Sequence, residues 1–214
     1  MIAAIGGTRR NGLFFAGDLG QRIFQQPFSW TQYGVDICGR SRTLKINYRT
    51  SHQIRQHADQ LLDLEGRDLD GNVQDRRGAV SVFNGPEPKI LHASDAEAES
   101  EQVALWLQEI SSKGLIPREI GVFVRSAAEL PRAQASLSTM HLAKGLEFRA
   151  VAVMACDEDV IPSPARIEAI TDDSDLDEIY DTERHLLYVA CTRARDHLLI
   201  SCGGVGSEFL EDMT

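Results

Sequence analysis

The stretch STMHLAKGLEF at residues 138–148 combines polar side chains and a glycine in a spacing suited to phosphate binding. Thr139 supplies a hydroxyl group and His141 an imidazole, and both follow an expected strand. Lys144 and Gly145 then bring the backbone close to a ligand. These groups can hold the phosphates of a single nucleic-acid strand without reading its bases. The stretch therefore predicts a phosphate contact at the end of a strand.

Glu147 lies near the end of this stretch, shortly before the next expected strand. A carboxylate in such a position can accept hydrogen bonds from a ribose hydroxyl, as acidic residues do in dinucleotide-binding folds. The local alternative is that Glu147 and His141 pair with each other, or with Lys144. The residues alone leave both interpretations open.

Three further stretches place polar groups where a strand or helix ends, which is where proteins bind phosphates: residues 17–24 (GDLGQRIF), 44–51 (LKINYRTS) and 182–201 (TERHLLYVACTRARDHLLIS). In the first, we expect an apolar strand over 13–16 that leads into a tight turn before Gln21. The Gln21 amide can accept a hydrogen bond from water and donate one to a phosphate oxygen, so it can report a terminal phosphate. The alternative is a turn without a ligand.

Two arginines stand at the ends of expected elements. Arg49 follows a strand expected at 44–46, and Arg193 lies near the end of a helix expected at 177–195. A guanidinium group can bind phosphate oxygens through two hydrogen bonds and offset charge that develops during phosphoryl transfer. For Arg49 the alternative is an ion pair with a surface carboxylate. For Arg193 it is an interaction with the helix dipole at the carboxyl end of the helix.

Strands alternate with helices along the chain, which predicts an α/β fold. Apolar runs indicate strands, and apolar residues spaced three and four apart indicate helices. We expect further strands at 79–83, 89–92, 120–124, 150–155 and 197–202, a helix that begins after Ser51, and a helix at 95–112 with Leu105, Trp106 and Ile110 on its apolar face. Because helices separate the strands, we expect a parallel sheet covered on both sides.

The composition is ordinary for a soluble globular protein, since 43% of the 214 residues are hydrophobic and 25% are charged. No apolar run approaches the roughly 18 residues of a membrane-spanning helix, and the N-terminus lacks the layout of a secretory signal. The four cysteines form no CxxC pair, so we expect free thiols and no metal site. These features predict a cytoplasmic protein without a membrane partner.

The net charge of −10 argues against binding to nucleic acid through bulk electrostatic attraction. The distribution of charge is uneven, however. Residues 40–55 contain five Lys and Arg residues and no acid, so a local basic surface can still meet a phosphate backbone. Residues 157–183 contain eleven acidic residues and one base, Arg166, and we expect a solvated, mobile loop there.

In this order, the four stretches resemble motifs III, IV, V and VI of the UvrD/Rep-like superfamily 1 DNA helicases. The resemblance implies a RecA-like fold of the P-loop NTPase type, with a parallel sheet and helices on both faces. It implies that residues 1–43 are the C-terminal remnant of a first RecA-like domain and that residues 44–214 are the second. The implied activity is ATP-driven translocation on single-stranded DNA, with duplex unwinding, through closure of a cleft between the domains.

The resemblance also implies a set of ATP-binding residues. Gln21 matches the glutamine of motif III, and Arg49 matches the arginine of motif IV. Within the pattern YVxxTRA, Arg193 matches the arginine finger of motif VI. Glu147 matches the ribose-binding acid of motif V, and Gly145 lies in the same contact. Of these residues, Gln21, Arg49 and Arg193 are the implied catalytic ones.

On the DNA side, the resemblance implies that Phe24 stacks on a base and that Thr139, His141 and Lys144 contact the strand. Trp30 has no clean counterpart in the family pattern. It is a physically reasonable stacking residue, and the alternative is a tryptophan of the core. The expected nucleic-acid partners are single-stranded DNA or DNA junctions.

The 214 residues contain no GxxxxGK[ST] phosphate loop. Without its lysine and its cradle of backbone N–H groups, this chain alone is not expected to bind ATP and Mg²⁺ tightly. We therefore expect a helicase portion that is inactive until an N-terminal RecA-like domain supplies the loop. One alternative is a catalytically dead nucleic-acid- or protein-binding module derived from a helicase. Another is a different nucleotide-binding enzyme, which predicts Arg49 and Arg193 on opposite faces.

Overall fold

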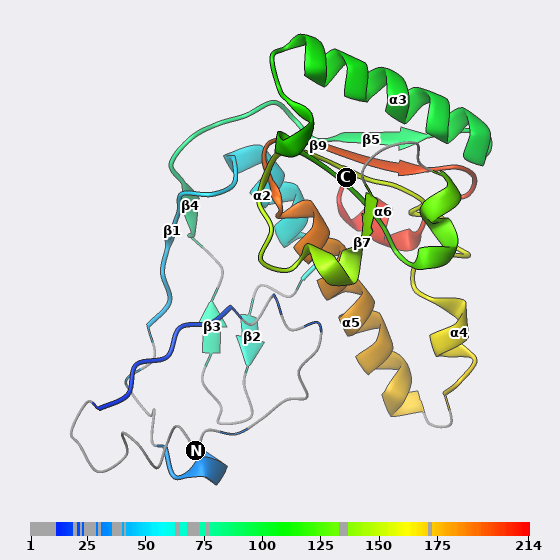
Figure 1. Cartoon of the computed structure of the whole chain (residues 1–214). Helices are drawn as coiled ribbons and strands as arrows, with labels where there is room; N and C mark the ends of the chain where they lie inside the picture. Colours follow the sequence, from blue (N-terminus) through cyan, green and yellow to red (C-terminus); the bar gives the residue numbers. More distant parts are fainter. Residues whose placement is uncertain are drawn as a thin grey trace.

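The computed structural model of the chain describes residues 12–18, 21, 23, 29, 31–35, 40, 42–62, 65–67, 73–75, 78–132, 137–170 and 173–214. Its centre is a five-stranded sheet with helices on both faces (Figure 1). This arrangement is the α/β fold that the alternation of strands and helices predicts. None of the described helices is long and apolar enough to cross a membrane.

The five strands of the main sheet lie in the order β5 (Lys89–His92), β9 (Ala194–Cys202), β8 (Phe148–Val153), β6 (Ile120–Val124) and β7 (Leu137–Thr139). Every neighbouring pair is parallel. The last four residues of β8 are buried, as expected of a central strand that has a helical layer on each side. The bounds of β5 and β6 agree with the predicted ones, whereas β8 and β9 begin earlier than predicted.

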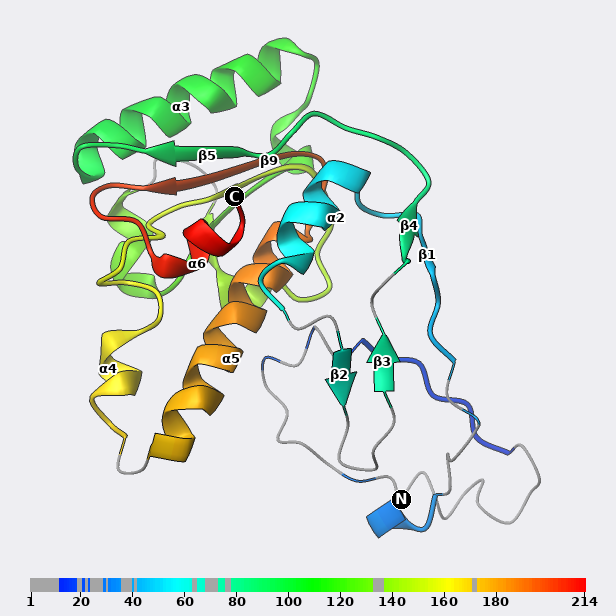
Figure 2. The same cartoon turned by 180° about the vertical axis from the view of Figure 1, so that it is seen from behind.

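Three long helices cover the sheet: α2 (His52–Asp59), α3 (Ala96–Ser112) and α5 (Asp173–Cys191). Helix α3 lies on one face, and α2 and α5 lie on the other, as Figures 1 and 2 show from opposite sides. Side chains of β8 point alternately to the two layers, because successive residues of a strand face opposite sides. Ala152 belongs to the cluster under α3, and Val151 belongs to the cluster under α2 and α5.

Helix α3 begins after Asp95, whose carboxylate accepts a hydrogen bond from the backbone N–H of Ala98 at 2.8 Å. The buried residues of this helix are Glu99, Val103, Trp106 and Ile110. The predicted apolar face included Leu105, which is 63% exposed. Successive helical residues are rotated by about 100°, so Leu105 cannot face the sheet beside Trp106.

Two pairs of short strands lie outside the main sheet. Strand β1 (Ile46–Asn47) pairs in parallel with β4 (Val80–Ser81), and β2 (Glu65–Arg67) pairs antiparallel with β3 (Val73–Asp75). The sequence predicts strands at both positions of the first pair, at 44–46 and 79–83, but not that they pair with each other. It does not predict the second pair, because residues 66–78 read as polar and rich in turns.

The N-terminal segment 12–18 contains no strand, although the sequence predicts one at 13–16. Phe14 in this segment is 91% exposed. A strand is stable only beside other strands and against a hydrophobic layer, and an apolar run alone supplies neither. A 3₁₀ helix, η2, spans Thr31–Tyr33.

The acidic segment 157–183 is not the solvated loop that its composition predicts. It contains α4 (Pro164–Ile167) and the first half of α5, and Glu183 within it is fully buried. Acidic residues in the first turn of a helix complement the helix dipole, so an acid-rich run is compatible with the start of α5 at Asp173.

Short helical elements complete the fold: η3 (Pro117–Glu119), η4 (Ala127–Arg132), η5 (Met140–Ala143) and α6 (Glu208–Asp212). Element η5 follows β7 directly and contacts α5. Helix α6 contributes apolar residues to the same core cluster as α2 and α5. The segment with the predicted phosphate contact is thus held between the sheet and a long helix.

Candidate nucleotide and nucleic-acid site

The structure brings together three predicted site residues from separate stretches, and we call Arg49, Glu147 and Arg193 the arginine cluster. Glu147 immediately precedes β8 and Arg193 immediately precedes β9, and these strands begin side by side, with Phe148 paired to Ala194. Arg49 joins them from the turn before α2. The cluster therefore lies at the amino ends of two neighbouring parallel strands.

Local hydrogen bonds fix the turn that carries Arg49. The side chain of Asn47 accepts hydrogen bonds from the backbone N–H groups of Arg49 at 2.8 Å and Thr50 at 3.2 Å. Ser51 is the N-cap of α2, as predicted, and its hydroxyl accepts a hydrogen bond from the N–H of Ile54. Asn and Ser side chains commonly stabilise turns and helix starts in this way. The backbone around Arg49 is therefore well defined.

Arg49 and Glu147 form an ion pair between Nη2 and Oε1, with side chains that are 44% and 59% exposed. The alternative considered for Arg49, an ion pair with a surface carboxylate, is therefore present. Its partner, however, is another predicted site residue. The local alternative for Glu147 is a pair with His141 or Lys144. The ion pair that the structure shows for Glu147 is instead with Arg49.

Arg193 lies in the turn between α5, which ends at Cys191, and β9, so the predicted helix end at residue 195 is too late. The Arg193 Nε donates a hydrogen bond to the carbonyl of Val189 at 2.9 Å, and Nη1 donates one to the carbonyl of Leu146 at 3.4 Å. Burial, and then the positive charge of Arg49, lower the pKa of Arg193. Leu146 precedes Glu147, which pairs with Arg49, so both arginines contact the same short segment. This placement disagrees with the interpretation that puts them on opposite faces.

Arg193 departs from one expectation, because an arginine finger is expected to reach outward and this side chain is only 1% exposed. The reason is the carbonyl of Val189 in the last turn of α5, which the guanidinium caps. The local alternative, an arginine that complements the carboxyl end of the helix, is therefore also present. The contact with Leu146 is long for a hydrogen bond and is the weaker of the two.

Gln21 ends a turn in which its backbone N–H donates a hydrogen bond to the carbonyl of Asp18 at 3.1 Å. Its Nε2 donates a hydrogen bond to the carboxylate of Asp18 at 3.0 Å, and the negative charge of Asp18 raises the pKa of Arg193. Phe24 and Trp30, predicted to stack on bases, lie outside the described residues, as does Gly20 of the same turn.

Residues 139–145, with the predicted contact to a DNA strand, begin at the last residue of β7, and we call them the strand-contact segment. Thr139 ends the strand and is partly buried, His141 is partly buried, and Lys144 is exposed. Gly145 has a φ of 88°, a conformation that glycine adopts without steric cost. Lys144 and the backbone beside it are open to solvent, as a contact with a phosphate backbone requires.

A buried ion cluster lies beside this segment. Glu183, on α5, accepts hydrogen bonds from the Nε and Nη2 atoms of Arg125 and, at 2.9 Å, from Nη1 of Arg166. Burial, and then the positive charge of Arg125, lower the pKa of His141. The sequence interpretation missed these residues. The available signal was Arg125, a charged residue directly after an apolar strand, which is the pattern that singled out Arg49.

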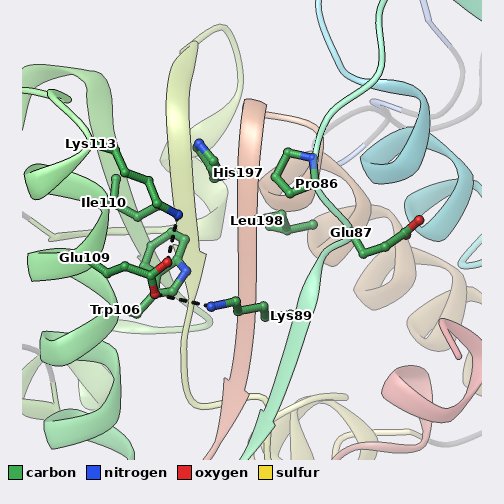
Figure 3. A pocket seen from close by; sticks show the side chains of 9 residues that line it. All are labelled: Pro86, Glu87, Lys89, Trp106, Glu109, Ile110, Lys113, His197 and Leu198. Atoms are coloured by element: carbon green, nitrogen blue, oxygen red, sulfur yellow. Dashed lines mark hydrogen bonds and ion pairs between the residues drawn. The ribbon is translucent and has the colours of Figure 1, made fainter.

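A small pocket lies on the α3 side of the sheet, near the amino ends of β5 and β9 (Figure 3). Glu109 pairs there with Lys89 at 3.3 Å and with Lys113 at 2.7 Å. His197 also lines the pocket, and burial, followed by the charge of Lys113, lowers its pKa. None of the predicted site residues lines this pocket.

The complete protein is expected to bind Mg²⁺ with ATP. Among the described residues, no group of three or more His, Cys, Asp or Glu side chains is arranged to hold a metal ion. The described residues thus contain no such set of ligands for Mg²⁺.

Comparison with known proteins finds similarity over a C-terminal part of the chain. Residues 127–203 match the family described as the UvrD-like helicase C-terminal domain. The chain is 44% identical to YjcD of Bacillus subtilis over 68 residues and 42% identical to the ATP-dependent DNA helicase PcrA of Staphylococcus epidermidis over 66 residues. Each match covers 31% of this chain and only 8% of the relative.

A solved structure supports the same fold. The C-terminal domain of a possible DNA helicase from Lactobacillus plantarum superposes with a TM-score of 0.53 and 22% sequence identity, over 78% of this chain and 94% of that domain. The likeness confirms the predicted α/β, RecA-like fold of the parallel sheet and its helices.

Proposed function

We propose that this chain is the C-terminal portion of an ATP-dependent DNA helicase of the UvrD/Rep-like superfamily 1, because residues 127–203 match the UvrD-like helicase C-terminal domain and the chain resembles helicases such as YjcD and PcrA. In this proposal, residues 44–214 form the second RecA-like domain and residues 1–43 are a remnant of the first. The portion couples ATP hydrolysis in the complete protein to movement on single-stranded DNA.

The observation that carries the proposal is the arginine cluster. Three separate stretches converge there, because Arg49 pairs with Glu147 and Arg193 Nη1 contacts the carbonyl of Leu146, the residue before Glu147. Two guanidinium groups can bind phosphate oxygens and offset charge that develops when the terminal phosphate is transferred. The carboxylate of Glu147 is suited to accept hydrogen bonds from a ribose.

In this proposal, Arg193 needs a small rearrangement before it reaches a phosphate. Its bond to the carbonyl of Val189 is short and well formed, whereas its Nη1 contact with Leu146 is 3.4 Å long. A phosphate oxygen would make a stronger, charge-assisted bond with Nη1 than that carbonyl does. The capped Nε atom would then hold the guanidinium in place while Nη1 changes partner.

The strand-contact segment supplies the DNA side of the proposal. Thr139, His141 and Lys144 present a hydroxyl, an imidazole and an ammonium group along one short stretch. Such a set binds phosphates and does not discriminate between bases. Gln21 would respond to the terminal phosphate of ATP through its side-chain amide.

The chain lacks a phosphate loop, so hydrolysis in this proposal requires an N-terminal RecA-like domain that also supplies the ligands of Mg²⁺. The decisive experiment joins the chain to the N-terminal domain of a PcrA relative and measures ATP hydrolysis with and without a dT oligonucleotide. DNA-stimulated hydrolysis that the N-terminal domain alone does not show supports the proposal. If the joined protein binds the oligonucleotide without stimulated hydrolysis, the chain is a binding module and the helicase assignment is wrong.

A further inference from the structure

Glu183 is a carboxylate with no exposed surface that lies between two arginines from different elements. Arg125, which follows β6, contacts it with two nitrogen atoms, and Arg166, on α4, contacts it with one. We call these three residues the Glu183 cluster. The cluster links the carboxyl end of β6 to helix α4 and helix α5.

Such a cluster is costly to bury. Removing two opposite charges from water costs several kcal/mol per ion, and apolar residues of similar size are often at least as stabilising in the same place. Stability alone therefore does not account for Glu183 in a helix whose neighbouring buried residues, such as Leu186 and Leu187, are apolar. Two arginines also fix the orientation of the Glu183 carboxylate, because a guanidinium that donates two hydrogen bonds to a carboxylate does so in a defined geometry.

The cluster lies directly beside the strand-contact segment. Arg125 follows Val124, and Val124 pairs with Thr139 in the register of β6 and β7. Element η5, which carries His141, contacts α5. The charges of Arg125, Glu183 and Arg166 all act on the His141 imidazole. Element η5 thus packs against β6, which leads to Arg125, and against α5, which carries Glu183.

We propose that Glu183, held by Arg125 and Arg166, is a positioning residue that sets the orientation of His141 for its contact with the phosphates of single-stranded DNA. This inference rests on the proposed function and extends it to a buried residue that itself touches no DNA. Arg125 connects Glu183 to the carboxyl end of β6, and Arg166 connects it to α4.

The electrostatic setting of His141 agrees with this role. Burial has the largest effect on its pKa and lowers it; Arg125 and Arg166 lower it further, whereas Glu183 raises it. The imidazole is therefore mainly neutral at pH 7 and offers the phosphate a hydrogen bond without a net charge. Its binding strength then depends on how the ring is oriented, and in this proposal the Glu183 cluster holds in place β6 and α5, the two elements that pack against η5.

The test uses the 214-residue chain, a fluorescent dT oligonucleotide and two readouts, anisotropy for affinity and NMR titration of the His141 ring for its pKa. Glu183→Gln should weaken binding about tenfold, the value of one hydrogen bond to a charged group. In a His141→Gln background, Glu183→Gln should cause no further loss, since both changes remove the same contact. Glu178→Gln, at an exposed residue of the same helix, is the matched control.

The substitution of Glu183 leaves Arg125 without its buried partner, so a milder variant provides a second arm. Arg166 is 39% exposed, and Arg166→Gln should raise the pKa of His141, whereas Glu183→Gln should lower it. Arg118→Gln, at an exposed residue of η3 at the amino end of β6, controls for the lost charge. An unchanged His141 pKa in Arg166→Gln, or additive losses in the double variant, would overturn the inference while leaving the proposed function intact. Failure of the wild-type chain to bind the oligonucleotide would instead overturn the DNA contact itself, and this inference with it.

Discussion

Arg49 and Glu147 form an ion pair that joins the turn before α2 to the start of β8. Both side chains are about half exposed, and each belongs to a different stretch of the sequence. In the proposed function, Arg49 binds phosphate and Glu147 binds ribose, so the pair holds two ligand-binding groups side by side. The contact therefore has to be weak enough to rearrange when a nucleotide binds.

The first prediction concerns the strength of this pair. Glu147→Gln should change the free energy of unfolding by less than about 1 kcal/mol, because exposed ion pairs are screened by water and salt. Urea unfolding of the wild-type chain and the variant measures the difference. In the protein joined to a phosphate-loop domain, the same substitution should raise the KM for ATP. A loss of stability above about 2 kcal/mol would show that the pair is structural.

The second prediction concerns Arg193. In the joined protein, Arg193→Ala should lower the kcat of DNA-stimulated ATP hydrolysis by about 10³- to 10⁵-fold, the usual contribution of an arginine finger. The KM for ATP should change little. Arg195→Ala is the matched control, since Arg195 is 57% exposed and its guanidinium lies over the ring of Phe83. An unchanged kcat in Arg193→Ala would leave only the helix-capping role.

Because Arg193 is buried, its replacement also tests the fold. The thermal unfolding of Arg193→Ala has to be measured beside its activity, since a side chain that caps α5 contributes to stability as well. A variant that is folded at the assay temperature and still inactive separates the two roles. A variant that unfolds below that temperature calls for Arg193→Lys, which keeps the charge and loses the planar hydrogen-bonding geometry.

The sequence predicts the elements of this fold better than their contacts. Strands 89–92 and 120–124 have the predicted bounds, because short apolar runs between polar turns carry a strong local signal. The strand predicted at 13–16 is absent, because an apolar run without a partner strand forms no ladder. Leu105 faces solvent because the helical period places Val103, Trp106 and Ile110 toward the sheet.

For the candidate site, too, the sequence predicts the individual residues better than the contacts between them. Residue type and order single out Arg49, Glu147 and Arg193, and the fold brings these three together. The burial of Arg193 and the Glu183 cluster are not visible in the sequence, because each depends on contacts between elements far apart in the chain. Glu183 in particular lies in an acid-rich segment whose composition indicates solvent exposure.

The third prediction uses two neighbouring glycines as a matched pair. A Cβ atom on Gly203 would approach the backbone N and Cα atoms of Ala96 to 2.8 Å, and backbone atoms cannot move aside without shifting α3. Gly203→Ala should therefore destabilise the chain by about 1–3 kcal/mol. A Cβ on Gly204 would meet its nearest atom, on Asp157, at 3.6 Å, so Gly204→Ala should change stability by less than about 0.5 kcal/mol. Equal effects in urea unfolding would contradict the close packing of α3 on the end of β9.

The fourth prediction concerns stability against pH and follows from His197. Burial, and then the charge of Lys113, lower the pKa of His197 below 6.5. The unfolded chain therefore binds more protons than the folded chain between the lowered pKa and pH 6.5. The stabilising contribution of neutral His197 is fully present above pH 6.5 and is lost as the pH falls toward the lowered value. His141, whose pKa is also lowered, acts in the same direction.

Thermal unfolding between pH 7.5 and 5.5 measures this effect. Asp95 and Glu109 have lowered pKa values and gain protons only below this pH range, so they do not contribute to the change. The melting temperature of the wild-type chain should fall across the window. His197→Gln and His141→Gln should each make the fall shallower, because glutamine does not titrate, and the double variant should be the shallowest. A slope that neither substitution alters would mean that both imidazoles titrate alike in the folded and unfolded chains.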